Sequence, residues 1–457
     1  MRSLISEIGI RLLKVSNLLL ITVPFAAAWQ LYYSQRTASP FYFWGNLVVI
    51  ALFVILYFLF GRTYDAFLIS HNRMSEIMIS QSLAAFLADC VIYLVITLLS
   101  KHLTNPLPLL GAFAVQIVFG ILWVLLASFI YYRMFPAKKT LIVYDSRKGL
   151  EDIIREYHME RKFNIIGSIT VKECLDDISL LDEAEEVFLS GVHSHDRNVI
   201  LKYCIYNDKR VYVIPRVGDV IMSGAHQVHL FHLPMMRVGR YKPTPEYIIA
   251  KRIFDIIASI LGLILLSPVF LAVAIAIKAS DKGPVFYRQE RLTRNGKHFI
   301  MHKFRSMVVD AEKDGIARLS TGADDERITP VGRFIRKFRI DELPQLIDIL
   351  EGNLSVVGPR PERPEIAEEY MKVMPEFRLR LQAKAGLTGY AQVYGKYNIT
   401  PYDKLQMDLM YIANPSFAED IRICLATIRV LFKPDSTDGI KQGRITALEY
   451  DEQDNDR

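Results

Sequence analysis

Asp341 and Glu342 are adjacent carboxylates directly in front of an apolar run, Leu343 to Leu350, which has a proline in its first turn. The pattern predicts a helix whose N-terminus lies at the pair. Free N–H groups and the dipole at a helix N-terminus favour anions, so by itself the pair is an ordinary acidic helix start. Two adjacent carboxylates can also bind a divalent cation, and one of them can act as a nucleophile.

Basic residues around the pair favour a chemical role. Arg336 and Arg339 precede the carboxylates, and Arg360 lies between two prolines that restrict its backbone. Lys303 and Arg305 supply a further cationic group. Together these side chains could offset the charge of a pyrophosphate, which needs positive groups around it to become electrophilic.

The elements that must position these residues begin with Ile256 to Ile277, an apolar segment with no charge in 22 residues. About 20 apolar residues are enough for a helix to cross a bilayer, but Ser267 and Pro268 in its middle predict a break. Basic residues crowd both flanks, so both ends are expected on the same side of the membrane. We expect a re-entrant helix over 253–278; a kinked fifth span is the alternative. The flanking residues are Lys251, Arg252, Lys278, Lys282, Arg288, Arg291, Arg294 and Lys297.

Four further apolar stretches precede this segment and predict four transmembrane helices within residues 1–136. They cover residues 15–35, 41–61, 77–100 and 109–132. Eight basic residues (Arg2, Arg11, Lys14, Arg62, Arg73, Arg133, Lys138, Lys139) would lie inside if the N-terminus is cytoplasmic, against two (Arg36, Lys101) outside. The positive-inside bias therefore places both ends of the bundle in the cytoplasm.

Residues 137–242 alternate between predicted strands and helices. Strands are predicted at 140–144, 164–170, 186–189 and 210–214, with helices at 149–160 and 196–206. This alternation predicts a small parallel α/β sheet of Rossmann-like type. The first strand-to-helix turn, 145–149, lacks the GxGxxG pattern, which argues against a dinucleotide ligand. A structural or regulatory module is the favoured interpretation.

Composition narrows the partners. The net charge of +6 suits a protein lying on anionic lipid, whereas scattered basic residues without a binding motif argue against nucleic acid. The four cysteines form no CxxC pair, so neither disulfides nor a zinc site is indicated. Two histidine groupings could suggest a metal site: 226, 229 and 232, and the pair 193 and 195 beside an aspartate. The first three have no ordered carboxylate partner and are more typical of loops or interfaces than of a metal site.

Motifs in the second half of the chain resemble those of the bacterial sugar transferases. Lys-Arg-Ile-Phe-Asp at 251–255, the Ser-Pro helix and Gly-Pro-Val-Phe-Tyr-Arg-Gln-Glu-Arg at 283–291 come in that family's order. Lys-Phe-Arg-Ser-Met at 303–307, Asp-Glu-Leu-Pro-Gln-Leu at 341–346, Val-Gly-Pro-Arg-Pro at 357–361 and Gly-Leu-Thr-Gly-Tyr-Ala-Gln-Val at 386–393 follow. The chain resembles the long form of a polyprenyl-phosphate phosphoglycosyl transferase of the bacterial inner membrane, which starts exopolysaccharide or O-antigen assembly.

The resemblance implies a mostly helical catalytic domain over 243–457 that uses a UDP-sugar, a polyprenyl phosphate such as undecaprenyl phosphate, and Mg²⁺. Asp341 would be the nucleophile, forming an aspartyl-phosphosugar and expelling UMP, while Glu342, with or without Asp341, would hold the metal. Gln289 and Arg291 would join the five cationic residues in substrate binding. A homodimer is also expected.

One position departs from the family pattern, because Lys384, Ala385 and Gly386 stand where Arg-Pro-Gly is usual. Lysine cannot grip a phosphate with two parallel hydrogen bonds as arginine does, so Lys384 is a doubtful phosphate ligand. Two other functions stay open on sequence alone. One is a membrane glycosyltransferase that releases UDP, and the other is a non-catalytic assembly or sensor protein.

Overall fold

The computed structural model describes residues 2–431, apart from 71, 146, 148, 310, 312–324 and 396–399. The chain divides into two compact units, Met1–Ile214 and Pro215–Arg457. The boundary lies directly after the fourth strand of the α/β region, some way before the predicted start of the catalytic domain at 243. The division into three domains expected from sequence therefore stays a prediction. The last residues of the predicted catalytic domain, beyond 431, lie outside the described part.

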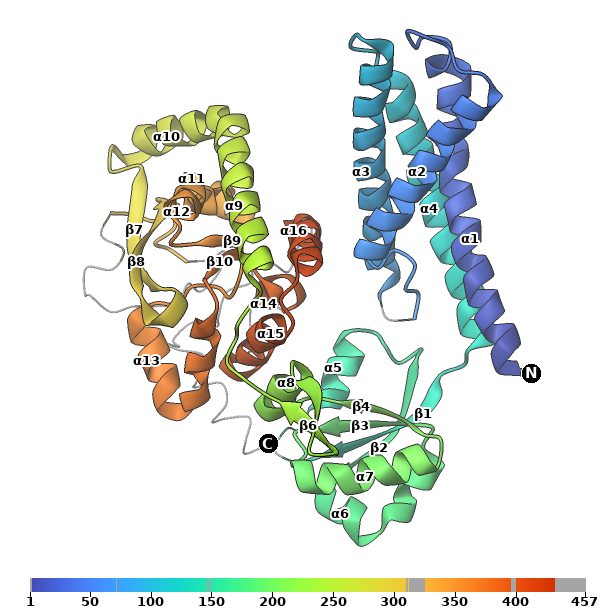
Figure 1. Ribbon diagram of the computed structural model, residues 1–457, viewed down its shortest axis with the longest axis vertical. Coiled ribbons are helices and arrows are strands. Elements are labelled where there is room, and N and C mark those ends of the chain that lie inside the picture. Colours follow the sequence, from blue (N-terminus) through green and yellow to red (C-terminus); the bar gives the residue numbers. More distant parts are fainter. Residues whose placement is uncertain are drawn as a thin grey trace. The chain divides into compact units, whose positions relative to one another are not determined.

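The first unit begins with four long helices that are apolar enough to cross a membrane. They are α1 (Arg2–Ala28, extended by the π-helical turn Trp29–Tyr33), α2 (Phe43–Thr63), α3 (Met74–Ser100) and α4 (Leu107–Met134) (Figure 1). Large rings fill the space between them, with Phe25 and Phe53 stacked at 4.4 Å between centroids. The four predicted membrane helices are confirmed.

The rest of the first unit is a four-stranded parallel sheet in the order β2-β1-β3-β4. Its elements are β1 (Lys138–Tyr144), α5 (Leu150–Glu156), β2 (Phe163–Thr170), α6 (Val171–Asp176), the 3₁₀ helix η2 (Ile178–Glu183), β3 (Glu186–Ser190), α7 (Ser194–Tyr206) and β4 (Arg210–Val213). Thr140 to Val143 of β1 are buried without alternation, as in parallel sheets covered on both faces. The predicted parallel α/β region is confirmed.

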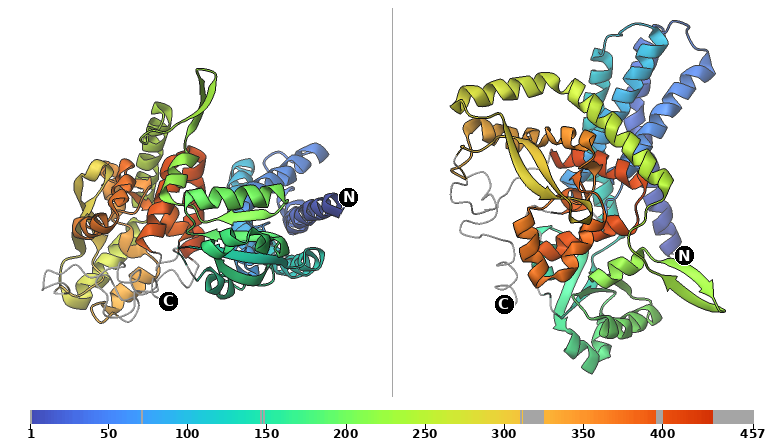
Figure 2. Two further views of the ribbon diagram at one scale, coloured as in Figure 1. Left: turned by 90° about the horizontal axis from the view of Figure 1, so that it is seen from below. Right: turned by 60° about the vertical axis from the view of Figure 1, so that its left-hand side comes forward.

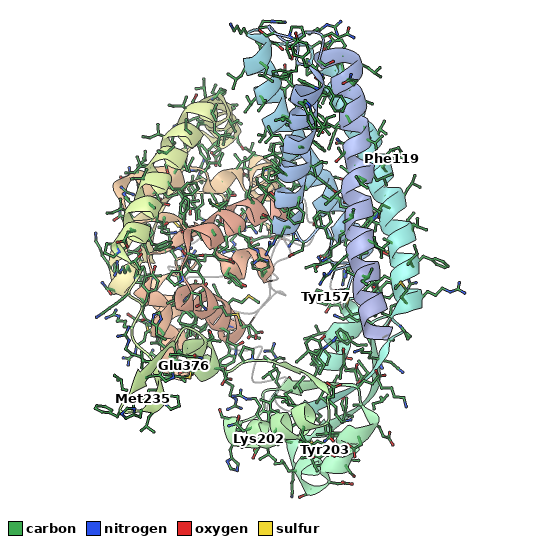
Figure 3. All side chains as sticks on the ribbon, turned by 45° about the vertical axis from the view of Figure 1, so that its right-hand side comes forward. Phe119, Tyr157, Lys202, Tyr203, Met235 and Glu376 are labelled. Atoms are coloured by element: carbon green, nitrogen blue, oxygen red, sulfur yellow. The ribbon has the colours of Figure 1, made fainter. Side chains whose placement is uncertain are left out.

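Arg73, just before α3, joins the bundle to this sheet region. Its guanidinium donates to the carbonyl oxygens of Glu156 (2.6 Å) and Tyr157 (3.1 Å) at the C-terminal end of α5, and it lies 4.8 Å from the Tyr157 ring centroid. Tyr157 is labelled in Figure 3. A cation at a helix C-terminus satisfies carbonyl groups that have no partner within the helix, so Arg73 provides a contact between the bundle and the sheet region inside the first unit.

The second unit is mostly helical. Its helices are α8 (Val217–Ser223), α9 (Pro245–Leu265), α10 (Ser267–Asp281), α11 (Pro330–Lys337), α12 (Gln345–Glu351), α13 (Pro364–Val373), α14 (Tyr390–Tyr394), α15 (Pro401–Ala413) and α16 (Phe417–Leu431), with 3₁₀ turns η3 (Arg294–Gly296), η4 (Ile340–Glu342) and η5 (Pro375–Gln382). Its strand pairs are the hairpin β5 (His226–Leu230) with β6 (Leu233–Arg237), the antiparallel pair β7 (Phe286–Leu292) with β8 (His298–Phe304), and the short parallel pair β9 (Ser355–Val357) with β10 (Gly386–Thr388).

The long apolar segment breaks where the sequence predicts. Helices α9 and α10 meet at an angle of 60° at Leu266, and Pro268 occupies the first turn of α10 (Figure 2, right). The Ser267 hydroxyl donates to the carbonyl of Ile264 at 2.8 Å. The break therefore leaves this carbonyl satisfied, which matters where water is scarce.

Helix α8 belongs with the second unit because it packs against α15. Val220 of α8 lies in the same buried core as Leu409 and Ile412 of α15. A β-carbon at Gly224 would come within 2.7 Å of the carbonyl oxygen of Ala413. The ends of α8 and α15 therefore approach this closely only because residue 224 is glycine.

Candidate active site

A strained turn carries the carboxylate pair. After α11 the chain reverses at Arg339, whose backbone is left-handed (φ 54°, ψ 23°), a conformation that costs a non-glycine residue about 1 kcal/mol or more. Asp341 and Glu342 follow in the 3₁₀ turn η4, and α12 begins at Gln345. The helix thus begins two residues after Leu343, the start of the predicted run, and the pair occupies a 3₁₀ turn of its own.

Glu342 is the centre of a buried charge cluster. Its Oε1 accepts from Arg360 at 2.8 Å and from Lys303 at 3.3 Å, and its Oε2 lies 3.8 Å from Arg339. These three cations come from the segment after β9, from β8 and from the turn itself. Three of the predicted cationic residues are therefore brought together on one carboxylate.

The two carboxylates differ in their pKa values. Burial disfavours the charge of Glu342, but Arg360, Lys303 and Arg339 outweigh it and hold the pKa of Glu342 well below its usual range. Burial and the neighbouring charge of Glu342 raise the pKa of Asp341 to about 6, with Lys303, Arg336 and Arg360 acting in the opposite direction. Arg336 thus also lies within electrostatic reach of the pair.

Asp341 accepts no hydrogen bond and forms no ion pair within the described part of the chain. A carboxylate in this state can act as a nucleophile, or can ligate a hard cation. Among the described residues, no group of three or more His, Cys, Asp or Glu side chains gathers. Because Mg²⁺ is commonly bound by one or two carboxylates together with substrate phosphates, the pair still fits that ion.

Gln289 and Arg291 lie beside the same cluster on β7. Arg291 donates to the Gln289 side chain and, at 3.1 Å, to the carbonyl of Pro361, next to Arg360. Burial lowers the pKa of Arg291 to about 10, with Glu362 opposing the shift and Arg360 adding to it. These two predicted substrate-binding residues are therefore placed next to the segment that carries Arg360.

Arg305 has a different position from the other predicted cations. It pairs with Asp281 at the end of α10, and its backbone N–H donates to the carbonyl of Val285 at 2.9 Å. A β-carbon at Gly283 would overlap the guanidinium, so a larger residue there would require Arg305 to move. Within the described contacts, Arg305 fastens α10 to β8 and does not join the cluster around Glu342.

Lys384 also lies elsewhere. Burial and the charges of Arg252 and Arg294 lower its pKa, and Asp255 opposes them. Lys384 therefore sits with the charged residues at the base of α9. This position agrees with the doubt raised by its departure from the family's arginine.

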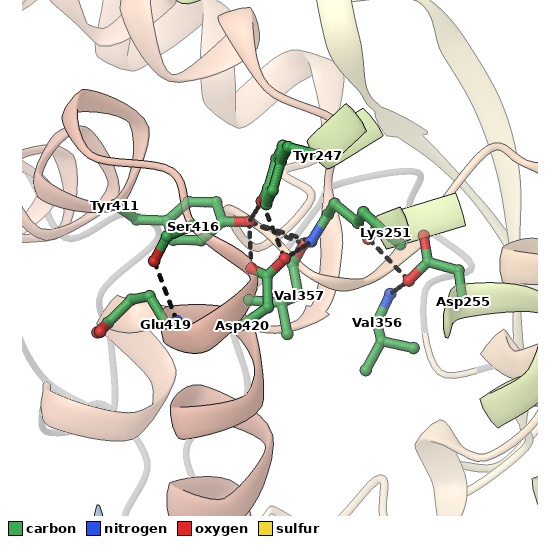
Figure 4. A network of polar contacts seen from close by, with 10 residues as sticks. Tyr247, Lys251, Asp255, Val356, Val357, Tyr411, Ser416, Glu419 and Asp420 are labelled. Carbon is green, nitrogen blue, oxygen red and sulfur yellow. Dashed lines mark hydrogen bonds and ion pairs between the residues drawn. The ribbon is translucent and has the colours of Figure 1, made fainter. Parts of the chain in front are cut away.

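The base of α9 holds a second buried network (Figure 4). Asp420 of α16 accepts from Lys251 (2.8 Å), Tyr247 (2.9 Å) and Tyr411 (2.8 Å). The next residue of α9 after Lys251, Arg252, donates to the carbonyls of residues 349 and 350 at the end of α12.

Asp255 completes the attachment of α9. It accepts from the hydroxyl of Ser355 (3.1 Å) and from the N–H of Val356 (2.9 Å) in β9. From sequence, residues 251–255 were only a shared motif. The partners of Lys251, Arg252 and Asp255 are 97 to 169 residues away, so no local pattern could have identified them.

The histidines are not gathered into a site. His226 and His229 lie on β5 and His232 in the hairpin turn, and residues three apart on a strand point to opposite faces. His193 lies 3.6 Å from Asp145 at the N-terminal end of α7. None of these belongs to a metal-binding group among the described residues.

Comparison with known proteins places the second half of the chain in a known family. Residues 246–434 match the family model described as bacterial sugar transferase. One relative, from Aeromonas hydrophila, is a UDP-N-acetylgalactosamine-undecaprenyl-phosphate N-acetylgalactosaminephosphotransferase, 36% identical over 48% of this chain and 52% of its own length. Two UDP-glucose:undecaprenyl-phosphate glucose-1-phosphate transferases also match: that of Escherichia coli (strain K12) is 38% identical over 45% and 44% of the two chains, and that of Caulobacter vibrioides 36% over 44% and 76%.

The chain spans about half the length of the first two relatives and three quarters of the third. The matched region contains both carboxylates, the cations around Glu342 and the broken helix. The chain belongs to the bacterial sugar transferase family.

Proposed function

We propose that this protein is a phosphoglycosyl transferase that moves a sugar 1-phosphate from a UDP-sugar to a polyprenyl phosphate, most simply undecaprenyl phosphate, and releases UMP. The observation that carries the proposal is Asp341, a half-buried carboxylate without an ion pair in the described part of the chain, surrounded by cations. The names of the relatives support the same pair of substrates. Such a reaction would be the first membrane step of exopolysaccharide, O-antigen or capsule synthesis.

The reaction needs two displacements at one phosphorus atom. In the first, an oxygen of Asp341 bonds to the phosphorus that bears the sugar, and the bond from that phosphorus to the bridging oxygen breaks. UMP leaves with the electron pair, and an aspartyl-phosphosugar remains on the protein. In the second, a phosphate oxygen of the lipid attacks the same phosphorus, and the carboxylate of Asp341 leaves. The product is a polyprenyl diphosphate sugar.

The cations act on the charge that develops during both steps. Arg360, Lys303 and Arg339 are held around Glu342, so they are oriented before the substrate arrives and need not reorganise during the reaction. Asp341 and Glu342 would hold Mg²⁺ together with the phosphates, and the ion would neutralise part of the pyrophosphate charge.

The broken helix bears on where the reaction takes place relative to the membrane. We propose that α9 and α10 form a re-entrant hairpin whose two ends lie on the cytoplasmic face of the inner membrane. The 60° bend and the basic residues on both flanks support this. Phe334 of helix α11 and Phe338, directly after it, are exposed beside basic residues, as expected of an interfacial helix. The site would then lie at the depth of the lipid phosphate, so the two reactants would be held close together.

The α/β region and the oligomeric state complete the proposal. We propose that the parallel α/β region is a Rossmann-like module. Its first turn lacks the glycines that let a backbone approach a pyrophosphate, so we assign it a structural or regulatory role outside the chemistry. We also propose that the protein works as a homodimer.

Product analysis tests the mechanism directly. Purified protein is incubated with UDP-sugars and polyprenyl phosphate, the nucleotide product is identified, and the protein is examined by mass spectrometry for an adduct on Asp341. UMP and an adduct are expected, and both should disappear in Asp341→Asn. Asp152→Asn, an exposed aspartate of α5, is the matched control and should behave as wild type. Release of UDP, or full activity in Asp341→Asn, would contradict the proposal.

Single cysteines test the topology separately. In a background in which the exposed Cys90 is replaced by serine, Glu246→Cys and Ile300→Cys should both be unreachable by an impermeant thiol reagent outside intact cells. Labelling at 300 alone would show that the segment crosses the membrane. Pro268→Ala should straighten the helix pair and lower activity while leaving binding of the nucleotide sugar.

A further inference from the structure

The five residues from Gly358 to Glu362, here called the Arg360 loop, have their backbone fixed by neighbouring elements. The carbonyls of Pro359, Pro361 and Glu362 accept from Gly386 N–H (2.9 Å), the Arg291 guanidinium (3.1 Å) and Leu292 N–H (3.0 Å), and Gly358 N–H donates to Thr388 (2.9 Å). The carbonyl of Arg360 itself accepts from the Arg380 guanidinium at 2.7 Å. The direction in which Arg360 points is therefore set by these contacts.

Arg380 makes one of these contacts, and the mechanism proposed above gives it no role. Its side chain is 2% exposed, and it lies in η5, far in sequence from the pair. Besides the carbonyl of Arg360, it contacts Asp408 of α15, with Nε at 2.9 Å and a terminal nitrogen at 2.7 Å from the same carboxylate oxygen. One planar guanidinium thus joins α15 to the backbone of Arg360.

A second ion pair lies beside the first. Glu362, the last residue of the Arg360 loop, pairs with Lys404 of α15 and lies 3.5 Å from Arg380. Burial opposes the charge of Glu362, but Lys404, Arg380 and Arg291 outweigh it and lower its pKa to about 2. We call Glu362, Arg380, Lys404 and Asp408 the charged support.

Stability alone does not explain why the support is charged. Replacing a buried ion pair by apolar residues of similar volume is often neutral or stabilising, so an apolar contact would hold α15 against the loop equally well. A guanidinium adds direction, because its rigid fork fixes two acceptors at once. Here those acceptors are the carboxylate of Asp408 and the carbonyl of the residue that contacts Glu342.

We propose that Arg380, held by Asp408, is a positioning residue that aims the Arg360 guanidinium at the pyrophosphate of the nucleotide sugar. The inference rests on the proposed function, because it gives Arg360 the task of binding that pyrophosphate. It adds that α15, which supplies no group to the chemistry, sets the geometry of the phosphate site through two buried side chains.

Arg380→Lys is the first test. Lysine keeps the charge beside Asp408 but cannot also reach the carbonyl of Arg360 with the same geometry. We expect kcat/KM for the UDP-sugar to fall about tenfold, the loss of one hydrogen bond of a charged group. KM for the UDP-sugar should rise, KM for the polyprenyl phosphate should stay unchanged, and the final amount of adduct per protein should match wild type. Arg378→Lys, an exposed arginine of the same 3₁₀ helix, should leave all four quantities unchanged.

A double-mutant cycle separates positioning from a general effect on the fold. In the Arg360→Lys background, Arg380→Lys should lower kcat/KM less than twofold further, because the guanidinium that it aims is already absent. The same tenfold loss in both backgrounds would overturn the inference, as would an Arg380→Lys protein that behaves like Arg378→Lys.

A variant with an apolar pair in place of Arg380 and Asp408 tests whether the kinetic effect arises without loss of the fold. Arg380→Met combined with Asp408→Leu removes both charges and leaves Glu362 paired with Lys404, so thermal unfolding should stay near that of wild type. This folded protein should show the rise in KM for the UDP-sugar, and wild-type kinetics would overturn the inference. Failure of the proposed function is a separate result, since it appears in the wild-type protein as release of UDP or absence of an adduct.

Discussion

Two buried charged clusters of the second unit can be compared, the base of α9 and the carboxylate pair. At the base of α9, Asp420 is 1% exposed and accepts from Lys251, Tyr247 and Tyr411. At the pair, Asp341 has no such partner in the described part of the chain, although cations surround it. Asp420 therefore has its charge satisfied by its neighbours, whereas Asp341 does not, although the cations around the pair outnumber its two carboxylates. An anionic ligand would offset the positive charge around the pair.

The comparison shows that buried charged residues of the same types can serve either to stabilise the fold or to carry out chemistry. A saturated buried network stabilises one arrangement, because removing a single partner leaves an unpaired charge. An unsaturated network costs stability until a ligand binds, which is the usual price of a functional site. Four predictions can break or sharpen this distinction, and they are ordered by the size of the expected effect.

The largest effect should come from making the same aspartate-to-asparagine substitution in each of the two clusters. Asp341→Asn should lower the transfer rate by about a thousandfold or more, with a melting temperature at or above that of wild type. Asp420→Asn should destabilise the protein by about 3 kcal/mol because Lys251 is left unpaired, with activity per folded molecule nearly retained. Product assays and thermal unfolding of both variants check this. Strong destabilisation by Asp341→Asn would erase the difference between the clusters.

Glu342→Gln should have the next largest effect. Glu342 contacts Arg360, Lys303 and Arg339, so its loss should cut turnover about a hundredfold by releasing these cations and weakening metal binding. A titration with Mg²⁺ distinguishes the two causes. Partial recovery at high Mg²⁺ supports a metal ligand, whereas a raised KM for the UDP-sugar without recovery supports a role in holding the cations.

The third prediction concerns pH. The pKa of Asp341 is raised to about 6, and only the ionised carboxylate can attack, so the reactive form is present above this pKa and is lost as the pH falls through it. The rate of adduct formation should therefore fall about tenfold per pH unit below 6. Removing a cation that favours ionisation, as in Arg360→Gln, should move the midpoint to higher pH. A rate that is flat between pH 5 and 7 would contradict the raised pKa.

The smallest effect should come from shortening the chain. A protein beginning at Pro215 and one beginning at Tyr241 should both keep measurable transfer in detergent, since neither loses a residue of the charged clusters. The shorter one lacks Val220, which is 2% exposed in the core with α15, so its melting temperature should be several degrees lower. Complete loss of activity in a well-folded protein beginning at Pro215 would assign the α/β region a role in the site.

The amino-acid sequence alone determined the features that depend on near neighbours. The lengths of the four apolar stretches, the break at Ser267 and Pro268 and the alternation of the α/β region are local patterns, and the structure follows them. The adjacent carboxylates and the ordered motifs around them likewise identified the family before any contact was known.

Only the tertiary structure decided which charges meet. Arg305 and Lys384 resemble phosphate ligands by residue type, yet Arg305 pairs with Asp281 and Lys384 lies by the base of α9. Arg380, without any local signal, supports the backbone of Arg360. The physical reason is that buried charges are placed by partners from other elements, often a hundred residues away, and the energy of such a pair depends on its distance and burial, which residue type and spacing do not contain.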